Sequence, residues 1–367
     1  MQELEQLREA LSELDVALLE MVARRQQIVA NIGRVKSAAG RGTRDYAREK
    51  DVLQLARRTA ARLNLDEEVG ADIFRLLIRA SLAAQEQDKV ASFGSGGGQR
   101  ALVIGGAGQM GQWFVRFLAS QGYQVEVCDP AGGLPGHISY SGLGDALLDQ
   151  DLIVVSAPIA TTAKILSELA RRRPSGVIFD ICSLKGPLLD GLRELQEAGC
   201  QVASVHPMFG PDTELLSGRN LVLVDLGMEQ ATATVRALFD STMVDQVSMS
   251  LEEHDKAMAY VLGLSHAINI AFFNALVESG EDAVSLAKLS SSTFDAQLDV
   301  ASRVSQENPY LYFEVQSLNS HTPRALIALL NAVTRLASRV LDQDERGFVE
   351  LMEQGKRFLT GRPGNRL

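Results

Sequence analysis

The N-terminal apolar positions repeat at the spacing of a helix face. The stripe comprises Leu4, Leu7, Leu11, Leu14, Leu18, Met21, Val22, Ile28, Ile32 and Val35. Intervals of three and four residues predict one long helix from about Glu3 to Ser37. Similar patterns predict a second helix from about Tyr46 to Leu63 and a third from about Glu67 to Lys89.

The pattern changes after a glycine-rich segment, SFGSGGGQR, which spans Ser92–Arg100 and predicts a flexible linker. Short apolar runs then alternate with helical stretches. These runs are ALVIGG, YQVEVCD, LIVVSAP, GVIFDICS, VASVHP and NLVLVD. Alternation of strand and helix predicts a doubly wound α/β sheet of the Rossmann type. From about Leu251 the strands stop, and about four helical segments, broken at Asn308-Pro309, fill the rest.

These patterns divide the chain into an all-α domain over 1–91, a linker over 92–100, an α/β domain over 101–250 and an all-α domain over 251–367. A length of 367 residues with 46% hydrophobic and 22% charged residues is typical of a folded protein with two or three domains.

The net charge of -10 and the lack of a basic tail predict no binding to nucleic acid. An anionic ligand must therefore bind in local cationic pockets. The polar start MQELEQLREA, without any apolar run long enough to span a bilayer, predicts a cytoplasmic protein without membrane contact. Cys128, Cys182 and Cys200 have no CxxC spacing, so we expect reduced thiols and no metal site.

A glycine-rich turn follows the first predicted strand directly. Gly106, Gly108 and Gly111 form the pattern G-x-G-x-x-G, with Gln109 and Met110 between the last two glycines. Such glycines let the backbone approach a pyrophosphate at the N-terminus of the next helix. Asp129 ends the next strand, where a carboxylate can accept hydrogen bonds from a ribose diol and repel a 2′-phosphate. The predicted cofactor is therefore NAD.

Polar side chains follow two later strands of the predicted sheet. Ser183 and Lys185 follow one strand in DICSLKG, and His206 ends another in ASVHPMFGPD. Ligands of open α/β sheets bind beyond the carboxyl ends of the strands. A histidine there can accept the proton of an alcohol when hydride leaves the same carbon. The roles of His254 and His266, on a later helix, stay open.

The first helix carries cations on its apolar side. Arg25 and Lys36 lie only about 20° apart in projection, and Ser81 and Gln85 continue the inward stripe of the third helix. Nearby polar side chains are Arg8, Asp45, Arg48 and Glu49. One interpretation is a salt-bridged unit in which the acids neutralise the cations. The other is a pocket that binds a small dicarboxylate and stabilises charge on an ether oxygen.

The N-terminal segment resembles the all-helical chorismate mutases. Their functional pattern is present as Arg8, Arg25, Lys36, Asp45, Arg48, Glu49, Ser81 and Gln85. The segment after the linker resembles prephenate dehydrogenase through GGAGQMG, DICSLKGP, HPMFGPD, EEHDKAM and SRVSQENP. The order on the chain resembles that of the bifunctional chorismate mutase–prephenate dehydrogenases of tyrosine biosynthesis.

The resemblance implies roles in the rearrangement of chorismate to prephenate. Arg25 and Arg48 bind the two carboxylates together with Arg8, which reaches in from the partner subunit of a homodimer. Lys36 and Gln85 donate to the ether oxygen.

The remaining mutase residues have supporting roles by the same resemblance. Glu49 accepts from the ring hydroxyl, and Ser81 and Asp45 support the site. The step needs no covalent intermediate, only a held conformer and stabilised charge separation.

The resemblance also implies roles in the NAD-dependent oxidative decarboxylation of prephenate to 4-hydroxyphenylpyruvate. His206 accepts the hydroxyl proton, Ser183 bonds the ring hydroxyl, and Arg303 binds a substrate carboxylate. Lys185 and His266 line the site.

Three alternatives stay open at the level of sequence. The dehydrogenase can act on arogenate or an amino-substituted prephenate instead. The N-terminal domain can be only a structural or regulatory dimerisation module. The chain can also be an NAD-binding sensor without activity, although His206 and Ser183 at strand ends disfavour this last reading.

Overall fold

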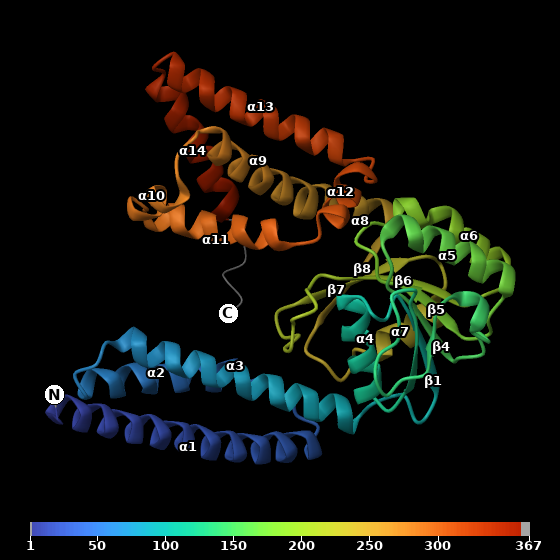
Figure 1. The fold of residues 1–367 in the computed structure, drawn as a ribbon, viewed down its shortest axis with the longest axis horizontal. Helices are drawn as coiled ribbons and strands as arrows, with labels where there is room; N and C mark the ends of the chain where they lie inside the picture. The colour runs from blue at the N-terminus through green and yellow to red at the C-terminus, as the bar shows by residue number, and fades with distance from the viewer. Residues whose placement is uncertain (1, 361–367) are drawn as a thin grey trace.

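The structure is a computed structural model that describes residues 2–360. Figure 1 shows three parts: a helical N-terminal unit, a sheet domain at one end of the molecule, and a helical C-terminal unit. Both helical units extend from the sheet domain toward the same side. The sheet domain therefore joins two helical units that are far apart in the sequence.

The three predicted N-terminal helices are confirmed. They are α1 (Gln2–Ala38), α2 (Tyr46–Arg62) and α3 (Glu67–Ser92). Two aspartates start the second and third helices, because their side chains satisfy free amide groups there. Asp45 accepts from the backbone nitrogen of Arg48, and Asp66 accepts from those of Glu68 and Val69.

The long helix α1 buries little of its apolar stripe. No residue of Gln2–Ala38 is buried. Leu4, Leu11 and Leu18 are 53%, 60% and 59% exposed. A continuous apolar face of this length is unusual on an isolated monomer, so it marks an interaction surface.

The glycine-rich segment is not a free linker, which corrects the expectation of flexibility. The backbone nitrogen of Gly96 donates to Gln121 O at 3.0 Å, and that of Gly98 donates to Gly122 O at 3.0 Å. The segment is thus held by backbone hydrogen bonds to the turn that follows α4. A Cβ on Gly96 would lie 2.5 Å from the backbone of Tyr123, so the close approach requires glycine.

The sheet has eight strands in the order β3-β2-β1-β4-β5-β6-β7-β8. The bounds are β1 (Arg100–Ile104), β2 (Gln124–Cys128), β3 (Ser139–Tyr140), β4 (Leu152–Val155), β5 (Val177–Asp180), β6 (Val202–Pro207), β7 (Asn220–Asp225) and β8 (Asp245–Ser250). All neighbours are parallel except β6 and β7. The six predicted strands and the doubly wound fold are confirmed. Two strands were not predicted: β3, which has only two residues, and β8, which is half-exposed and polar.

Helices cover both faces of this sheet. They are α4 (Gln109–Ser120), α5 (Ile159–Arg172), α6 (Leu189–Glu197) and α7 (Glu229–Ala237), with short turns η1 (Leu143–Asp145) and η2 (Gly186–Leu188). Phe114 of α4 and Phe239, directly after α7, belong to one core, whereas Leu166 and Leu195 belong to the other. Ligands of such open α/β sheets bind beyond the carboxyl ends of the strands.

The C-terminal unit contains more helices than the four or so expected. They are α8 (Leu251–Met258), a π-helical turn η3 (Ala259–Leu264), α9 (Ser265–Glu278), α10 (Ala283–Lys288), α11 (Ser292–Gln306), α12 (Pro309–Ser317), α13 (Thr322–Leu341) and α14 (Glu345–Thr360). The predicted break is confirmed, because Asn308 caps α12 by accepting from the nitrogen of Tyr310.

One helical run in the described chain, Leu251–Glu278, passes a length and composition test for a membrane span. Its mean hydropathy is 1.5, and 11% of the tested window is buried. The expectation that no segment meets this test is therefore wrong. A single such helix is weak support for a span, because apolar helices that pack against other protein pass the same test.

Candidate active sites

Arg25 lies between α1 and α3 without an acidic partner among the described residues. Its Nη1 donates to Ser81 Oγ at 2.9 Å and to Leu77 O at 3.3 Å. Its guanidinium also lies 5.9 Å from the ring centre of Phe74. Burial lowers the pKa of Arg25, as expected for a cation without a neighbouring carboxylate. Arg25 and Ser81, two of the predicted mutase residues, are thus in direct contact.

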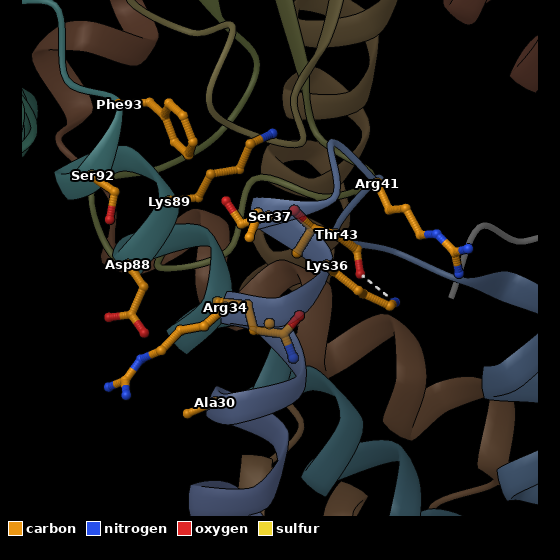
Figure 2. A pocket seen from close by; sticks show the side chains of 13 residues that line it. Ala30, Arg34, Lys36, Ser37, Arg41, Thr43, Asp88, Lys89, Ser92 and Phe93 are labelled. Atoms are coloured by element: carbon orange, nitrogen blue, oxygen red, sulfur yellow. Dashed lines mark hydrogen bonds between the residues drawn. The ribbon is translucent and has the colours of Figure 1, made fainter.

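Lys36 and Gln85 line one cavity of about 330 Å³ between the ends of α1 and α3. Figure 2 shows Lys36 with its ammonium group directed to the carbonyl of Thr43, a contact of 3.2 Å. Gly33 allows this approach of the helices, because a Cβ there would lie 2.9 Å from Gln85 Cγ. Gly33 was not among the predicted site residues.

The acids at the start of α2 do not neutralise Arg25 or Lys36. Asp45 caps α2 through the nitrogen of Arg48 at 3.0 Å. Glu49 instead pairs with Arg44 through two bonds of 3.0 Å. The salt-bridged interpretation of the inward cations is therefore wrong for the described residues. Arg44 is a neighbour of the site that was not predicted from the sequence.

Arg8 lies far from the other mutase residues of its own chain. It is exposed and contacts Glu5 one turn away at 3.3 Å. Seventeen positions along a helix separate Arg8 from Arg25, which is about 25 Å at 1.5 Å per residue. One subunit therefore cannot bring Arg8 to Arg25.

The glycine loop after β1 fits a dinucleotide. Gly105 has φ of +80°, and a Cβ there would lie 2.2 Å from Ser156 O. A Cβ on Gly111 would lie 2.0 Å from Gly105 O. Gly108 starts α4 without a side-chain cap, so the first amide groups of α4 stay available for a pyrophosphate. Gly105, which precedes the predicted set, is the position that needs a left-handed backbone.

Asp129 shapes this loop from the end of β2. One carboxylate oxygen accepts from the nitrogen of Ala107 at 3.0 Å, and the other accepts from that of Ala131 at 2.8 Å. A carboxylate has about four acceptor positions, so two remain for a ribose diol. Asp129 thus holds the loop and keeps the acceptor capacity that NAD requires.

His206 starts a hydrogen-bonded series of buried side chains. Its Nδ1 lies 2.9 Å from His254 Nε2, and His254 Nδ1 lies 2.8 Å from Asp255 Oδ1. Burial, followed by the nearby His254 and Lys185, lowers the pKa of His206 well below its usual value. A neutral imidazole at the end of β6 is suited to accept a proton.

Lys185 lies at a different place from the one expected for a residue that lines the site. Its side chain has no exposed surface, and its Nζ contacts Asp180 Oδ1 at 2.5 Å and Val205 O at 2.7 Å. The ammonium group therefore joins the ends of β5 and β6. This position favours a structural brace under His206 over contact with a substrate.

The other expected dehydrogenase residues are partly accessible. Ser183 is half-buried in the turn after β5. His266 stacks on Tyr312 with ring centres 4.0 Å apart, and burial lowers the pKa of His266 to about 4. The Nδ1 atom of His266 has no hydrogen-bond partner in the described structure. Arg303 is exposed on α11.

Hydrogen bonds join the N-terminal helices to the sheet domain at the loop after β6, the strand that carries His206, and at the segment before β8. Glu86 of α3 accepts from the nitrogens of Leu216 at 2.7 Å and Met243 at 2.5 Å. Arg44 donates to Ser217 Oγ at 2.7 Å. The loop that follows the strand of His206 is thus in direct contact with the N-terminal helical unit.

Three family models match the chain in order. They are chorismate mutase type II over residues 7–86, the nucleotide-binding domain of prephenate dehydrogenase over 137–245, and the dimerization domain of prephenate dehydrogenase over 250–354.

Full-length relatives have the same order of domains. The chain is 27% identical to a T-protein of Enterobacter agglomerans, with 98% of this chain and 95% of the relative covered. It is 23% identical to a T-protein of Haemophilus influenzae, with 95% and 90% covered.

The fold is also similar to a solved structure of prephenate dehydrogenase from A. aeolicus in complex with hydroxyphenyl propionate and NAD+. The TM-score is 0.59 at 20% identity, with 72% of this chain and 98% of that chain covered. The mutase match, the two dehydrogenase matches and the full-length relatives agree, and the chain belongs to the bifunctional chorismate mutase–prephenate dehydrogenases.

Proposed function

We propose that the chain catalyses two consecutive steps of tyrosine biosynthesis at two separate sites. The N-terminal helices rearrange chorismate to prephenate. The sheet and C-terminal helices convert prephenate to 4-hydroxyphenylpyruvate by NAD-dependent oxidative decarboxylation. The observation that carries the first activity is the pair Arg25 and Lys36, two inward cations without an acidic partner in the described structure. Such cations are suited to a dianionic substrate.

In the mutase site, the cations supply electrostatic catalysis. Arg25 and Arg48 bind the carboxylates of chorismate, while Lys36 and Gln85 donate to the ether oxygen as its bond breaks. Ser81 orients Arg25, which it contacts at 2.9 Å. These donors interact more strongly with the charge that develops in the transition state than with the bound substrate, and they therefore lower the barrier.

Acids complete the same site. Glu49 accepts from the ring hydroxyl, and Arg44 holds the Glu49 carboxylate with two hydrogen bonds. Asp45 fixes the first turn of α2 and thereby the position of Arg48.

In the dehydrogenase site, His206 accepts the proton of the ring hydroxyl, and Ser183 bonds the same oxygen. Arg303 binds a carboxylate of prephenate, and His266 lines the site beside Tyr312. The carbinol carbon loses a hydride, the bond to the ring carboxylate breaks, and carbon dioxide leaves. The electron pair of that bond completes the aromatic ring.

Bound NAD supplies the hydride acceptor for this step. The residues that would hold its pyrophosphate are Gly106, Gly108, Gln109, Met110 and Gly111, and Asp129 would accept from its ribose. The loop fits a pyrophosphate because its turn is tight: a Cβ on Gly111 would collide with the backbone of Gly105.

We further propose a cytoplasmic homodimer with domains over 1–91, 101–250 and 251–367. A second copy covers the stripe of α1 and brings Arg8 of the partner subunit to Arg25. The match of 250–354 to a dimerization domain supports a second contact there, which would cover the apolar run Leu251–Glu278.

The experiment that tests both activities is NADH formation by the purified protein with chorismate and NAD. A lag followed by steady NADH production is the expected result. NADH from added prephenate alone would exclude the mutase activity. NADH from neither substrate would exclude the prephenate dehydrogenase and direct the assay to arogenate and amino-substituted prephenate.

A further inference from the structure

The residues behind His206 form a directional series of hydrogen bonds. His254 has no exposed side-chain surface, and the side chain of Asp255 is 7% exposed. Both lie on α8, whose first turn is fixed by a capping box between Ser250 and Glu253. Because the series is buried and each distance is below 3 Å, each nitrogen must have a defined role as donor or acceptor.

The carboxylate of Asp255 sets the direction. It accepts from the backbone nitrogens of Lys185 at 2.9 Å and Gly186 at 2.6 Å. Burial raises the pKa of Asp255, but the bonds from His254 and from these two amides outweigh burial and lower it. Asp255 is therefore an ionised acceptor, so His254 Nδ1 must carry a proton and donate to it.

The tautomer of His206 follows from that of His254. A neutral imidazole carries one proton, so His254 Nε2 is an acceptor when Nδ1 is the donor. The neighbouring His206 Nδ1 must then carry the proton and donate to His254. His206 Nε2 is left bare, and a bare nitrogen is what a general base requires.

We propose that His254 and Asp255 are positioning residues that hold the proton of His206 on Nδ1 and keep Nε2 free for the proton of the substrate. This inference rests on the proposed role of His206 as the base. Asp255 also fixes the turn after Ser183, because it binds the amides of Lys185 and Gly186. One carboxylate thus aligns the base and the turn that presents the hydroxyl of Ser183.

The other charged groups beside the series do not supply an alternative acceptor for His206. Lys185 from the turn after β5 is a cation, and it is paired with Asp180 of β5. Asp180 Oδ1 accepts from that ammonium group and from the nitrogen of Cys182 at 2.9 Å. Asp255 is therefore the acid that acts on the histidine pair.

The first test reads the tautomer directly, without cofactor or turnover. Long-range proton–nitrogen correlation spectra of the full-length protein labelled at its five histidines separate the Nδ1–H and Nε2–H forms. The signal of His206 is identified by its loss in His206→Asn. We expect the Nδ1–H form for His206 and for His254. An Nε2–H form at His206 would overturn the proposal.

Matched variants then connect the tautomer with catalysis. His254→Leu removes the acceptor, and we expect mixed tautomers of His206 and a fall in dehydrogenase kcat of roughly 100-fold or more. His254→Gln keeps a side-chain oxygen that can accept from His206, so it should recover much of kcat. Glu252→Gln changes an exposed acid on the same helix and should leave kcat unchanged.

The controls separate this proposal from simple misfolding. Mutase activity of the same chain and the Kd for NAD should be unchanged in His254→Leu. Equal losses of kcat in His254→Leu and His254→Gln, with the Nδ1–H form kept in both, would overturn the positioning role. Failure of the proposed function has a different signature, namely normal kcat in His206→Asn.

Discussion

The carboxylate of Glu86 accepts a hydrogen bond from the backbone nitrogen of Leu216 at 2.7 Å, which joins the last mutase helix to the loop after the strand of His206. Glu86 is only 3% exposed and also accepts from the nitrogen of Met243. It directly follows Gln85, the proposed donor to the ether oxygen. The dehydrogenase domain thus anchors the helix turn that carries a mutase residue.

Glu86→Ala should weaken the docking of the two domains. The buried amide of Leu216 and the half-buried amide of Met243 would lose their acceptor, and a buried unsatisfied group costs about 1–3 kcal/mol. We expect faster proteolysis near residues 93–99 and lower mutase activity, measured on the full chain. Gln87→Ala, an exposed neighbour, is the control. Equal proteolysis rates of Glu86→Ala and the parent protein would show that this contact does not hold the domains together.

Ser217→Ala tests coupling from the dehydrogenase side. Ser217 Oγ accepts from Arg44, and Arg44 holds the carboxylate of Glu49. Loss of this anchor should lower mutase kcat/KM by roughly tenfold, because a hydrogen bond to a charged group such as the Arg44 guanidinium contributes about 1.5–3 kcal/mol. Dehydrogenase activity on prephenate should stay unchanged. A mutase rate identical to that of the parent protein would contradict the coupling.

The helices and strands were predictable because their apolar periods are long and regular. The apolar stripe from Leu4 to Val35 has the period of a helix, so α1 can be predicted without knowledge of its tertiary contacts. The two-residue strand β3 and the polar strand β8 have no such period, so they could not be found. Their pairing is decided by neighbouring strands.

For the two sites, only the types of the functional residues and their spacing along the chain could be predicted, not the contacts between them. The G-x-G-x-x-G pattern identified the loop, but the need for positive φ falls on Gly105, one position earlier. Spacing also left open which acid pairs with which cation, because Arg44 and Glu49 meet only when the turn before α2 folds. The contact of His254 with His206 joins residues 48 positions apart, which no local pattern records.

Lys36→Ala should abolish mutase turnover and leave prephenate-dependent NADH formation intact. Removal of a preorganised donor to a developing charge typically lowers kcat by 10²–10³-fold. The assay is loss of chorismate absorbance, followed by NADH formation from added prephenate on the same sample. Lys50→Ala, an exposed lysine of α2, is the matched control. Unchanged mutase kinetics in Lys36→Ala would remove Lys36 from the site.

His206→Asn should lower dehydrogenase kcat by about 10²–10⁴-fold, the usual contribution of a general base. Binding of NAD, measured by fluorescence titration, should change little, because the glycine loop lies after a different strand. Mutase activity of the same sample reports on folding. A normal kcat would exclude His206 as the base.

His266 should make the protein less stable below neutral pH. Burial lowers the pKa of His266 to about 4, whereas an unfolded histidine titrates near its usual value of about 6.5. Between these values the unfolded chain binds a proton that the folded chain does not, so the free energy of unfolding falls as pH is lowered from 6.5 toward 4.

His266→Phe can keep the stacking on Tyr312 but cannot titrate. Urea unfolding of both proteins at pH 7, 6 and 5 should therefore show a smaller loss of stability in the variant. The loss should not vanish, because His206 also has a lowered pKa. Equal losses in the two proteins would show that His266 is protonated as easily in the folded chain as in the unfolded one.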